Sequence, residues 1–223
     1  MSAAMAASAA PGSRQVLIEG EAADLQGTLA WPEHPSGAVV IFGDTARDGG
    51  EPALLARRLR EAGLATLSVG LPEQSARKPG LAQQLLSLAH WVRRQRETEH
   101  LPVGVYAPEG TMRVAIAAAT MEPESIDAIV VRGGIPRGAH TELPGLHAAT
   151  LFLVESDDPR DALRTMAALG GLHCDTLVVD LRRARGSNGT TSHAELAANW
   201  TAEWLVEHLT FERTWKARQL INV

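Results

Sequence analysis

The sequence predicts an α/β protein built on a mostly parallel, doubly wound β-sheet with an antiparallel hairpin at its N-terminal end. Short runs of nearly uniform hydrophobicity, such as Ala38–Phe42, are typical of strands buried on both faces of a parallel sheet. These runs alternate with stretches in which apolar residues recur at helical spacing, as Leu54, Leu55 and Leu59 do. Such alternation indicates right-handed crossovers, with helices on both faces of the sheet.

The hairpin is predicted from two β-like runs near the start of the chain, Gln15–Ile18 and Gly27–Trp31. Further strands are expected at Ala38–Phe42, Ala65–Val69, Val103–Ala107, Ala128–Val131, Thr150–Glu155 and Thr176–Leu181. Helices are expected at Pro52–Ala62, Leu81–Glu97, Pro159–Leu169 and His193–Leu209, with one more starting near Pro108.

A chain of 223 residues is long enough for one domain with a sizeable core. We predict a disordered leader at residues 1–14, the domain at 15–209 and a tail at 210–223. The leader lacks the basic start and leucine-rich middle of a signal peptide. A single cysteine, Cys174, rules out an internal disulfide and favours a reducing, cytoplasmic location.

The bulk charge and hydropathy limit the classes of partner. A formal charge of −5 argues against nucleic acid as the main partner. No apolar run approaches the roughly 18 residues that cross a bilayer, so no membrane span is expected. The histidines and the cysteine do not have metal-ligand spacing, and we expect neither a metal nor a cofactor.

The stretch Val103–Thr120 passes from a strand through Pro108, Glu109 and Gly110 directly into an Ala-rich helical run. This is the strand–turn–helix arrangement of a nucleophile elbow, in which G-x-S-x-G surrounds the reactive side chain. Here the nucleophile position holds Glu109. Pro108 favours the first position of a helix, and a carboxylate beside it suits the helix dipole, so we interpret the turn as a relaxed helix start.

The order of elements and several local strings resemble the α/β-hydrolase superfamily, in its dienelactone-hydrolase-like branch. The strings are Glu61–Leu67, Val103–Thr120, Arg132-Gly133-Gly134 and the pair Trp200 and Trp204. The resemblance covers roughly Val16–Leu209 and implies the α/β-hydrolase fold. It also implies ester or lactone hydrolysis by a Ser or Cys nucleophile, an Asp and a His, with an oxyanion hole partly built by the loop after the first central strand.

The resemblance places the catalytic acid at Asp158, although an N-cap before the helix is an equal alternative for this residue. The base position falls near Arg185 and Gly186, where no histidine stands. His193 comes later, at the predicted start of the last helix. The resemblance therefore implies a degenerate catalytic triad.

The oxyanion position holds Phe42 and Gly43 where the family has His-Gly, and Asp44 follows them. With Pro108 and Gly110, these residues are expected to form the pocket. An oxyanion hole needs donors and positive potential, and carboxylates at Asp44 and the nucleophile position would oppose the developing charge.

Other chemistry stays open at two places. Three carboxylates expected at the carboxyl edge of the sheet could hold a divalent cation or a cationic ligand, namely Asp44, Glu109 and Asp158. A Gly-containing loop offers an anion grip, or only a solvated surface, with Arg182, Arg183 and Arg185.

The tail carries Phe211, Trp215, Leu220 and Ile221. Such a segment either packs back on its own domain or docks against a protein partner or a second copy.

Two hypotheses follow. The first is a catalytically degenerate hydrolase homologue, a pseudoenzyme that acts as a binding, assembly or regulatory subunit. The second is an active ester or lactone hydrolase with a rearranged site, in which Asp158 orients His193 and Glu109 acts as nucleophile or general base.

Overall fold

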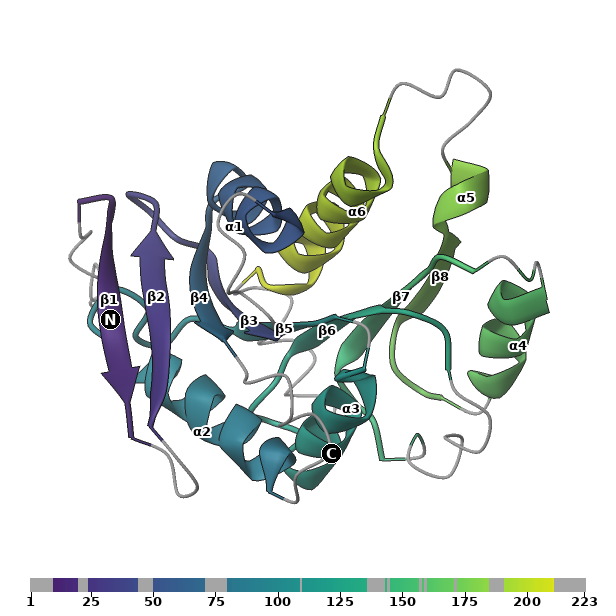
Figure 1. Cartoon of the computed structure of the whole chain (residues 1–223). Helices are drawn as coiled ribbons and strands as arrows, with labels where there is room; N and C mark the ends of the chain where they lie inside the picture. Colours follow the sequence, from purple (N-terminus) through teal and green to yellow (C-terminus); the bar gives the residue numbers. More distant parts are fainter. Residues whose placement is uncertain are drawn as a thin grey trace, which may run out of the picture.

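The computed structural model describes residues 10–19, 24–43, 50–70, 80–108, 110–135, 143, 145–156, 158, 160–170, 172–184 and 191–210. Its strands (Figure 1) are β1 Gly12–Ile18, β2 Leu25–Trp31, β3 Gly37–Gly43, β4 Leu64–Gly70, β5 Val103–Ala107, β6 Ala128–Arg132, β7 Ala149–Val154 and β8 Thr176–Asp180. Its helices are α1 Glu51–Glu61, α2 Leu81–Arg93, α3 Met112–Met121, α4 Arg160–Ala168, α5 Leu181–Ala184 and α6 His193–His208.

The strands form one sheet in the order β1-β2-β4-β3-β5-β6-β7-β8. β1 and β2 pair in an antiparallel hairpin, with Gly12 opposite Trp31 and Ile18 opposite Leu25. β2 runs antiparallel to β4, whereas every pairing from β4 through β3 to β8 is parallel. The predicted fold class is confirmed. β1 begins at Gly12, within the segment expected to be a leader.

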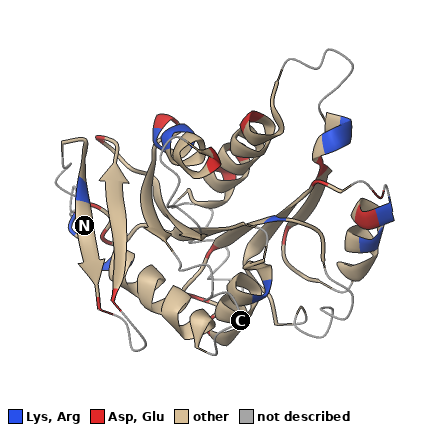
Figure 2. Cartoon of the chain, viewed as in Figure 1, with Lys and Arg blue, Asp and Glu red and all other residues tan. Residues whose placement is uncertain are grey.

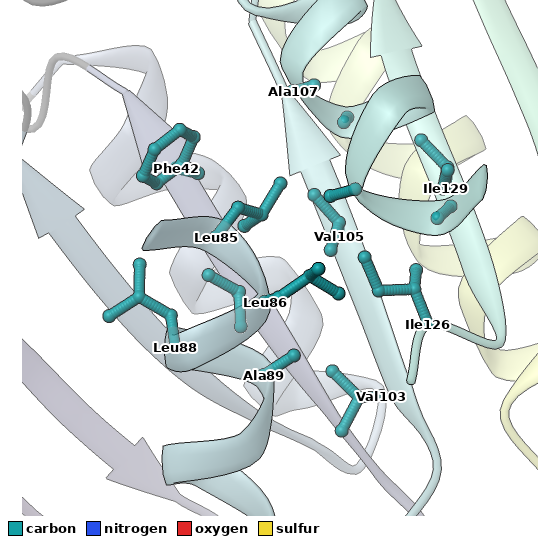
Figure 3. Close-up of a cluster of buried hydrophobic side chains, with 14 of the residues drawn as sticks. Phe42, Leu85, Leu86, Leu88, Ala89, Val103, Val105, Ala107, Ile126 and Ile129 are labelled. Atoms are coloured by element: carbon teal, nitrogen blue, oxygen red, sulfur yellow. The ribbon is translucent and has the colours of Figure 1, made fainter. Parts of the chain in front are cut away.

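Helices cover both faces of the sheet (Figure 1). α1 and α6 cover one face and pack together, and α2 and α3 cover the other. Figure 3 shows the core under α2, where Leu85 and Leu88 lie near Phe42 of β3 and Val105 of β5. No helix in the described part of the chain is both long enough and apolar enough to cross a membrane.

α6 packs directly on the central strands because these strands have glycine beneath it. A Cβ at Gly104 of β5 would lie 2.9 Å from Leu205 Cδ2, and a Cβ at Gly37 of β3 would lie 2.8 Å from Leu209 Cβ. These glycines therefore set the depth of α6 and hold its N-terminal end over the carboxyl edge of the sheet.

Candidate functional site

The candidate site lies at the carboxyl ends of β5, β6 and β7. Arg132 is the last residue of β6, and Glu155 directly follows β7. Side chains alternate between the two faces of a strand. Arg132 shares its face with Val130, and Glu155 shares its face with Leu153, and both apolar residues belong to the core under α1 and α6. The two charged groups therefore project on the side where α1 and α6 begin.

Arg132 is the centre of a charge network. Its Nη2 lies 2.6 Å from Glu155 Oε2, and its Nη1 pairs with Oε1 of Glu51, the first residue of α1. The Arg132 side chain is 19% exposed, and the two carboxylates are about one-third exposed. Charge-assisted bonds of this kind are among the stronger polar contacts in proteins. The guanidinium thus ties α1 to the ends of β6 and β7.

His193 completes the network from α6. It is the first residue of that helix, which Ser192 caps by accepting from the backbone N–H of Glu195, while the Glu195 carboxylate accepts from the N–H of Ser192. The imidazole Nδ1 pairs with Glu155 Oε1. A carboxylate on Nδ1 fixes the orientation of a histidine ring and leaves Nε2 as the nitrogen that would exchange a proton.

Burial raises the pKa of the Glu155 carboxyl, but bonds and charges from Arg132 and His193 outweigh this effect. The net result is a pKa below its ordinary value of 4.5. Glu155 is therefore an ionised acceptor at neutral pH.

The stabilising effect of Glu155 should depend on pH. Because its pKa is lower in the folded state, the ionised group stabilises the fold above about pH 4.5, and this stabilisation is lost as the pH falls through the folded-state pKa. We expect wild type to exceed Glu155→Gln in free energy of unfolding near pH 7, by a margin that shrinks at about pH 3.5. Urea unfolding at both pH values measures it. A margin that stays constant would contradict the assignment.

Tyr106 of β5 borders the network. Its hydroxyl lies 3.5 Å from Glu51 Oε1, and its ring is buried. Burial, followed by the negative charge of Glu155, raises the pKa of the hydroxyl above its ordinary value of 10.0. Tyr106 is therefore a neutral hydrogen-bond donor.

The turn after β5 differs from the predicted helix start. α3 begins at Met112, because Gly110 adopts a left-handed φ of +90° and interrupts the helical path. The N–H and the Oγ1 of Thr111 both donate to the carbonyl of Pro108, at 3.1 and 2.8 Å. The interpretation of Pro108 as the first helical residue is thus wrong. Glu109 lies outside the described residues.

The expected oxyanion position is packed against this turn. A Cβ on Gly43 would lie 2.4 Å from Pro108 Cγ, so the proline ring lies directly against the end of β3. The side chain of Phe42 is fully buried in the core beneath α2. Of the residues expected to form a pocket, Gly43 and Pro108 are in contact with each other, whereas Phe42 is a core residue. Asp44 lies outside the described residues.

Asp158 and His193 do not pair in the structure. The Asp158 carboxylate accepts from the backbone N–H of Arg160 at 2.9 Å and pairs with Arg164 at 2.9 Å, which places Asp158 at the start of α4. The hydrolase hypothesis paired Asp158 with the imidazole of His193. This pairing is corrected: the imidazole of His193 contacts Glu155, which follows β7 directly, and not Asp158.

The base position, Arg185 and Gly186, lies outside the described residues. The neighbouring arginines stand on α5, which follows β8 directly, and the backbone N–H groups of Arg182 and Arg183 donate to Asp180 Oδ1. The strand predicted to reach Leu181 thus ends at Asp180. Among the described residues, no group of His, Cys, Asp or Glu could hold a metal ion.

Sequence reasoning did not assign a site role to Glu51, Tyr106 or Glu155, and it used Arg132 only as part of the string Arg132-Gly133-Gly134. A signal was present for Arg132 and Glu155, because each is a charged residue that ends a buried apolar strand. In parallel sheets, residues at this edge are the ones that meet ligands.

The sheet order and the likeness to solved structures show an α/β-hydrolase fold of the dienelactone-hydrolase-like kind. A dienelactone hydrolase from Anabaena variabilis superposes with a TM-score of 0.70 at 25% identity, over 89% of this chain and 99% of that chain. The esterase domain of a Rhodothermus marinus protein gives 0.66 at 15% identity, over 89% and 100%. A cold-adapted esterase from an Arctic intertidal metagenomic library gives 0.64 at 13% identity, over 90% and 95%.

Two curated relatives come from two strains of Mycobacterium tuberculosis, and their names describe candidate phosphoribosyl transferases. Each is 29% identical over 196 residues, which is 82% of this chain and 44% of the relative. The chain thus spans less than half the length of the curated relatives it matches. No protein-family model matches it.

Proposed function

We propose that this chain is a non-hydrolytic homologue of the α/β-hydrolases, which uses the fold as a binding, assembly or regulatory subunit. The network Glu51–Arg132–Glu155–His193 is the single observation that carries the proposal. It engages the Nδ1 side of His193 and places a guanidinium at the end of β6, beside the strand that carries the nucleophile position.

The groups of this network find their partners within the chain. Two carboxylates share one guanidinium, and one of them also contacts an imidazole, so the cluster joins α1, β6, β7 and α6 as a structural unit. Breaking such a partly buried network to admit a substrate would leave charges without partners, which is costly.

The contact of Pro108 with Gly43 supports the same proposal. Acyl transfer needs hydrogen-bond donors aimed at the place where the oxyanion develops. The proline ring lies against the end of β3, next to the loop that helps to build the oxyanion hole in the hydrolases. A Pro residue also brings no N–H of its own to this position.

The curated relatives support the assembly part of the proposal. In them, the aligned region makes up 44% of a longer protein, so the corresponding unit is joined to further chain. The transferase named for the relatives describes that longer protein. We propose that this chain likewise works beside a second protein unit, in the cytoplasm, as its single cysteine suggests.

Hydrolysis assays test the proposal directly. We expect wild type, His193→Gln and Glu109→Gln to give the same slow, non-saturable release from p-nitrophenyl acetate, p-nitrophenyl butyrate and a γ-lactone. Each variant should keep the wild-type circular dichroism spectrum, so that equal rates reflect chemistry and not unfolding. A saturable rate in wild type that is lost in both variants would overturn the proposal.

The second candidate is hydrolysis by the rearranged site, and the contact of Glu155 with His193 Nδ1 favours it. A carboxylate that orients an imidazole is the supporting half of an acid–base pair. In this scheme Glu109 attacks the acyl carbon as nucleophile, and Nε2 then takes a proton from the water that hydrolyses the acyl intermediate. Alternatively, Glu109 as general base takes the proton from the attacking water and passes it to the leaving alkoxide. The same assays distinguish the two, because only this candidate predicts that Glu155→Gln lowers a saturable rate.

A further inference from the structure

The two outer strands of the sheet have different surfaces. β1 exposes Ser13, Arg14 and Gln15, the kind of polar side chains that discourage pairing with another chain. β8, with the sequence TLVVD, pairs only with β7 among the described strands. A short apolar edge strand with one open hydrogen-bonding side is a template for a further strand.

α4 lies beside this edge (Figure 1). It also exposes apolar residues to water. Leu163 is 62% exposed and Met166 is 55% exposed. Ala167 is also exposed, and its spacing from Leu163 puts both residues on the same side of the helix. Thr165, which faces the sheet, is buried and accepts from the N–H of Ile135. A surface helix ordinarily shows polar residues where α4 shows leucine and methionine.

Met166 brings the apolar surface of α4 towards the open edge of β8. A helix turns by about 100° per residue, so Met166 lies on the flank next to the sheet-facing Thr165, whereas Leu163 and Ala167 lie on the side away from the sheet. In a right-handed crossover from β7 through α4 to β8, this flank of α4 faces the side of β8 that is not paired with β7. The opposite flank carries Asp161 and Arg164, which pair with each other. The strand edge and the apolar flank are therefore parts of one surface.

Charges at the two ends of β8 are complementary under one arrangement. Asp175 precedes the strand; its side chain is 62% exposed and lies 3.4 Å from His208 Nε2. The other end carries Asp180, which pairs with Arg183, together with Arg182, so its net charge is positive (Figure 2). Antiparallel pairing of two β8 strands centred on Val178 would set Asp175 of one copy beside the arginines of the other, twice by symmetry. Parallel pairing would instead bring like charges together.

We propose that β8 and the apolar flank of α4 (Leu163, Met166 and Ala167) form a symmetric interface between two copies of this chain. The two β8 strands pair antiparallel and join the sheets, and the two α4 helices meet on the same face of the joined sheet. An isologous contact of this kind closes after two copies, as most soluble homo-oligomers do. The interface is independent of the proposed function, because it makes no use of Glu51, Arg132, Glu155 or His193.

Sedimentation equilibrium over a wide concentration range tests the interface. We expect a dimer for wild type. Leu163→Glu and Met166→Glu should each weaken the association, with a dissociation constant raised more than about 100-fold. Both positions are exposed in the single copy, so the fold should tolerate the change. Leu17→Glu is the matched control, because Leu17 is 61% exposed on β1 at the other end of the sheet. It should stay dimeric.

Charge reversal gives a second arm that does not depend on apolar contacts. Asp175→Arg should weaken the dimer, and adding Arg182→Asp and Arg183→Asp to it should restore the dimer. Rescue cannot come from a general effect on folding, and thermal melts of each variant check the fold.

Three outcomes would overturn the proposal. The first is a wild-type chain that is monomeric at every concentration. The second is a dimer that survives Leu163→Glu and Met166→Glu unchanged. The third is a chain ending at Leu209 that becomes monomeric, because the tail would then carry the association. None of these outcomes bears on the hydrolysis assays.

Discussion

Replacing Phe42 with alanine is expected to destabilise the fold by about 3–5 kcal/mol. Phe42 is fully buried and is one of the largest side chains in the core. Its removal loses the transfer free energy of the ring and leaves a cavity beneath α2. Guanidinium chloride unfolding, read as a lower midpoint with an unchanged slope, measures the effect.

This variant also separates two roles for Phe42. The hydrolase resemblance puts Phe42 at the oxyanion position, where its loss would act on turnover and not on stability. Leu17→Ala is the control, since this side chain is 61% exposed, and it should change stability by less than about 0.5 kcal/mol. A Phe42→Ala protein as stable as the control would show that the ring is not a core element.

Arg132→Met should cost about 2–3 kcal/mol, because it leaves Glu51 and Glu155 facing each other without their shared cation. This value lies below the cost of breaking a fully buried pair, since the Arg132 side chain is 19% exposed. The methionine keeps much of the aliphatic bulk, so the loss reports mainly on charge. Urea unfolding at neutral pH measures it.

The matched control for this variant stands on the surface of α1. Arg57 lies 3.6 Å from Glu61, and both side chains are more than half exposed. Arg57→Met should therefore change stability by no more than about 0.5 kcal/mol. Equal losses in the two variants would mean that the network is worth no more than a solvated surface pair.

The sheet could be predicted from the sequence because its strands are buried on both faces. Runs such as Ala38–Phe42 and Val103–Ala107 have no polar residue to break them, and strands in the structure cover both runs. The ends of the helices are harder to predict where the backbone conformation of a single residue decides them. At α3, a glycine with left-handed backbone delays the helix, and its identity alone does not reveal its φ.

The site could be predicted less well, for a physical reason. Asp158 and Glu155 both follow the same strand, and sequence position favours neither as the partner of His193. The choice depends on which face the strand presents and on where α6 begins. Burial on alternate positions of β7 assigns Glu155 to the face of α6, whereas Asp158 is used by its own helix. Contacts of this kind come from tertiary packing.

The contact between Pro108 and Gly43 has a consequence for protein engineering. A reactive side chain introduced after β5 would stand beside a pyrrolidine ring that already contacts the end of β3, so exchanging that one residue leaves this contact in place. Redesign would have to begin with the spacing between two neighbouring strand ends. Catalysis would also require room for water and an acyl group beside the introduced side chain.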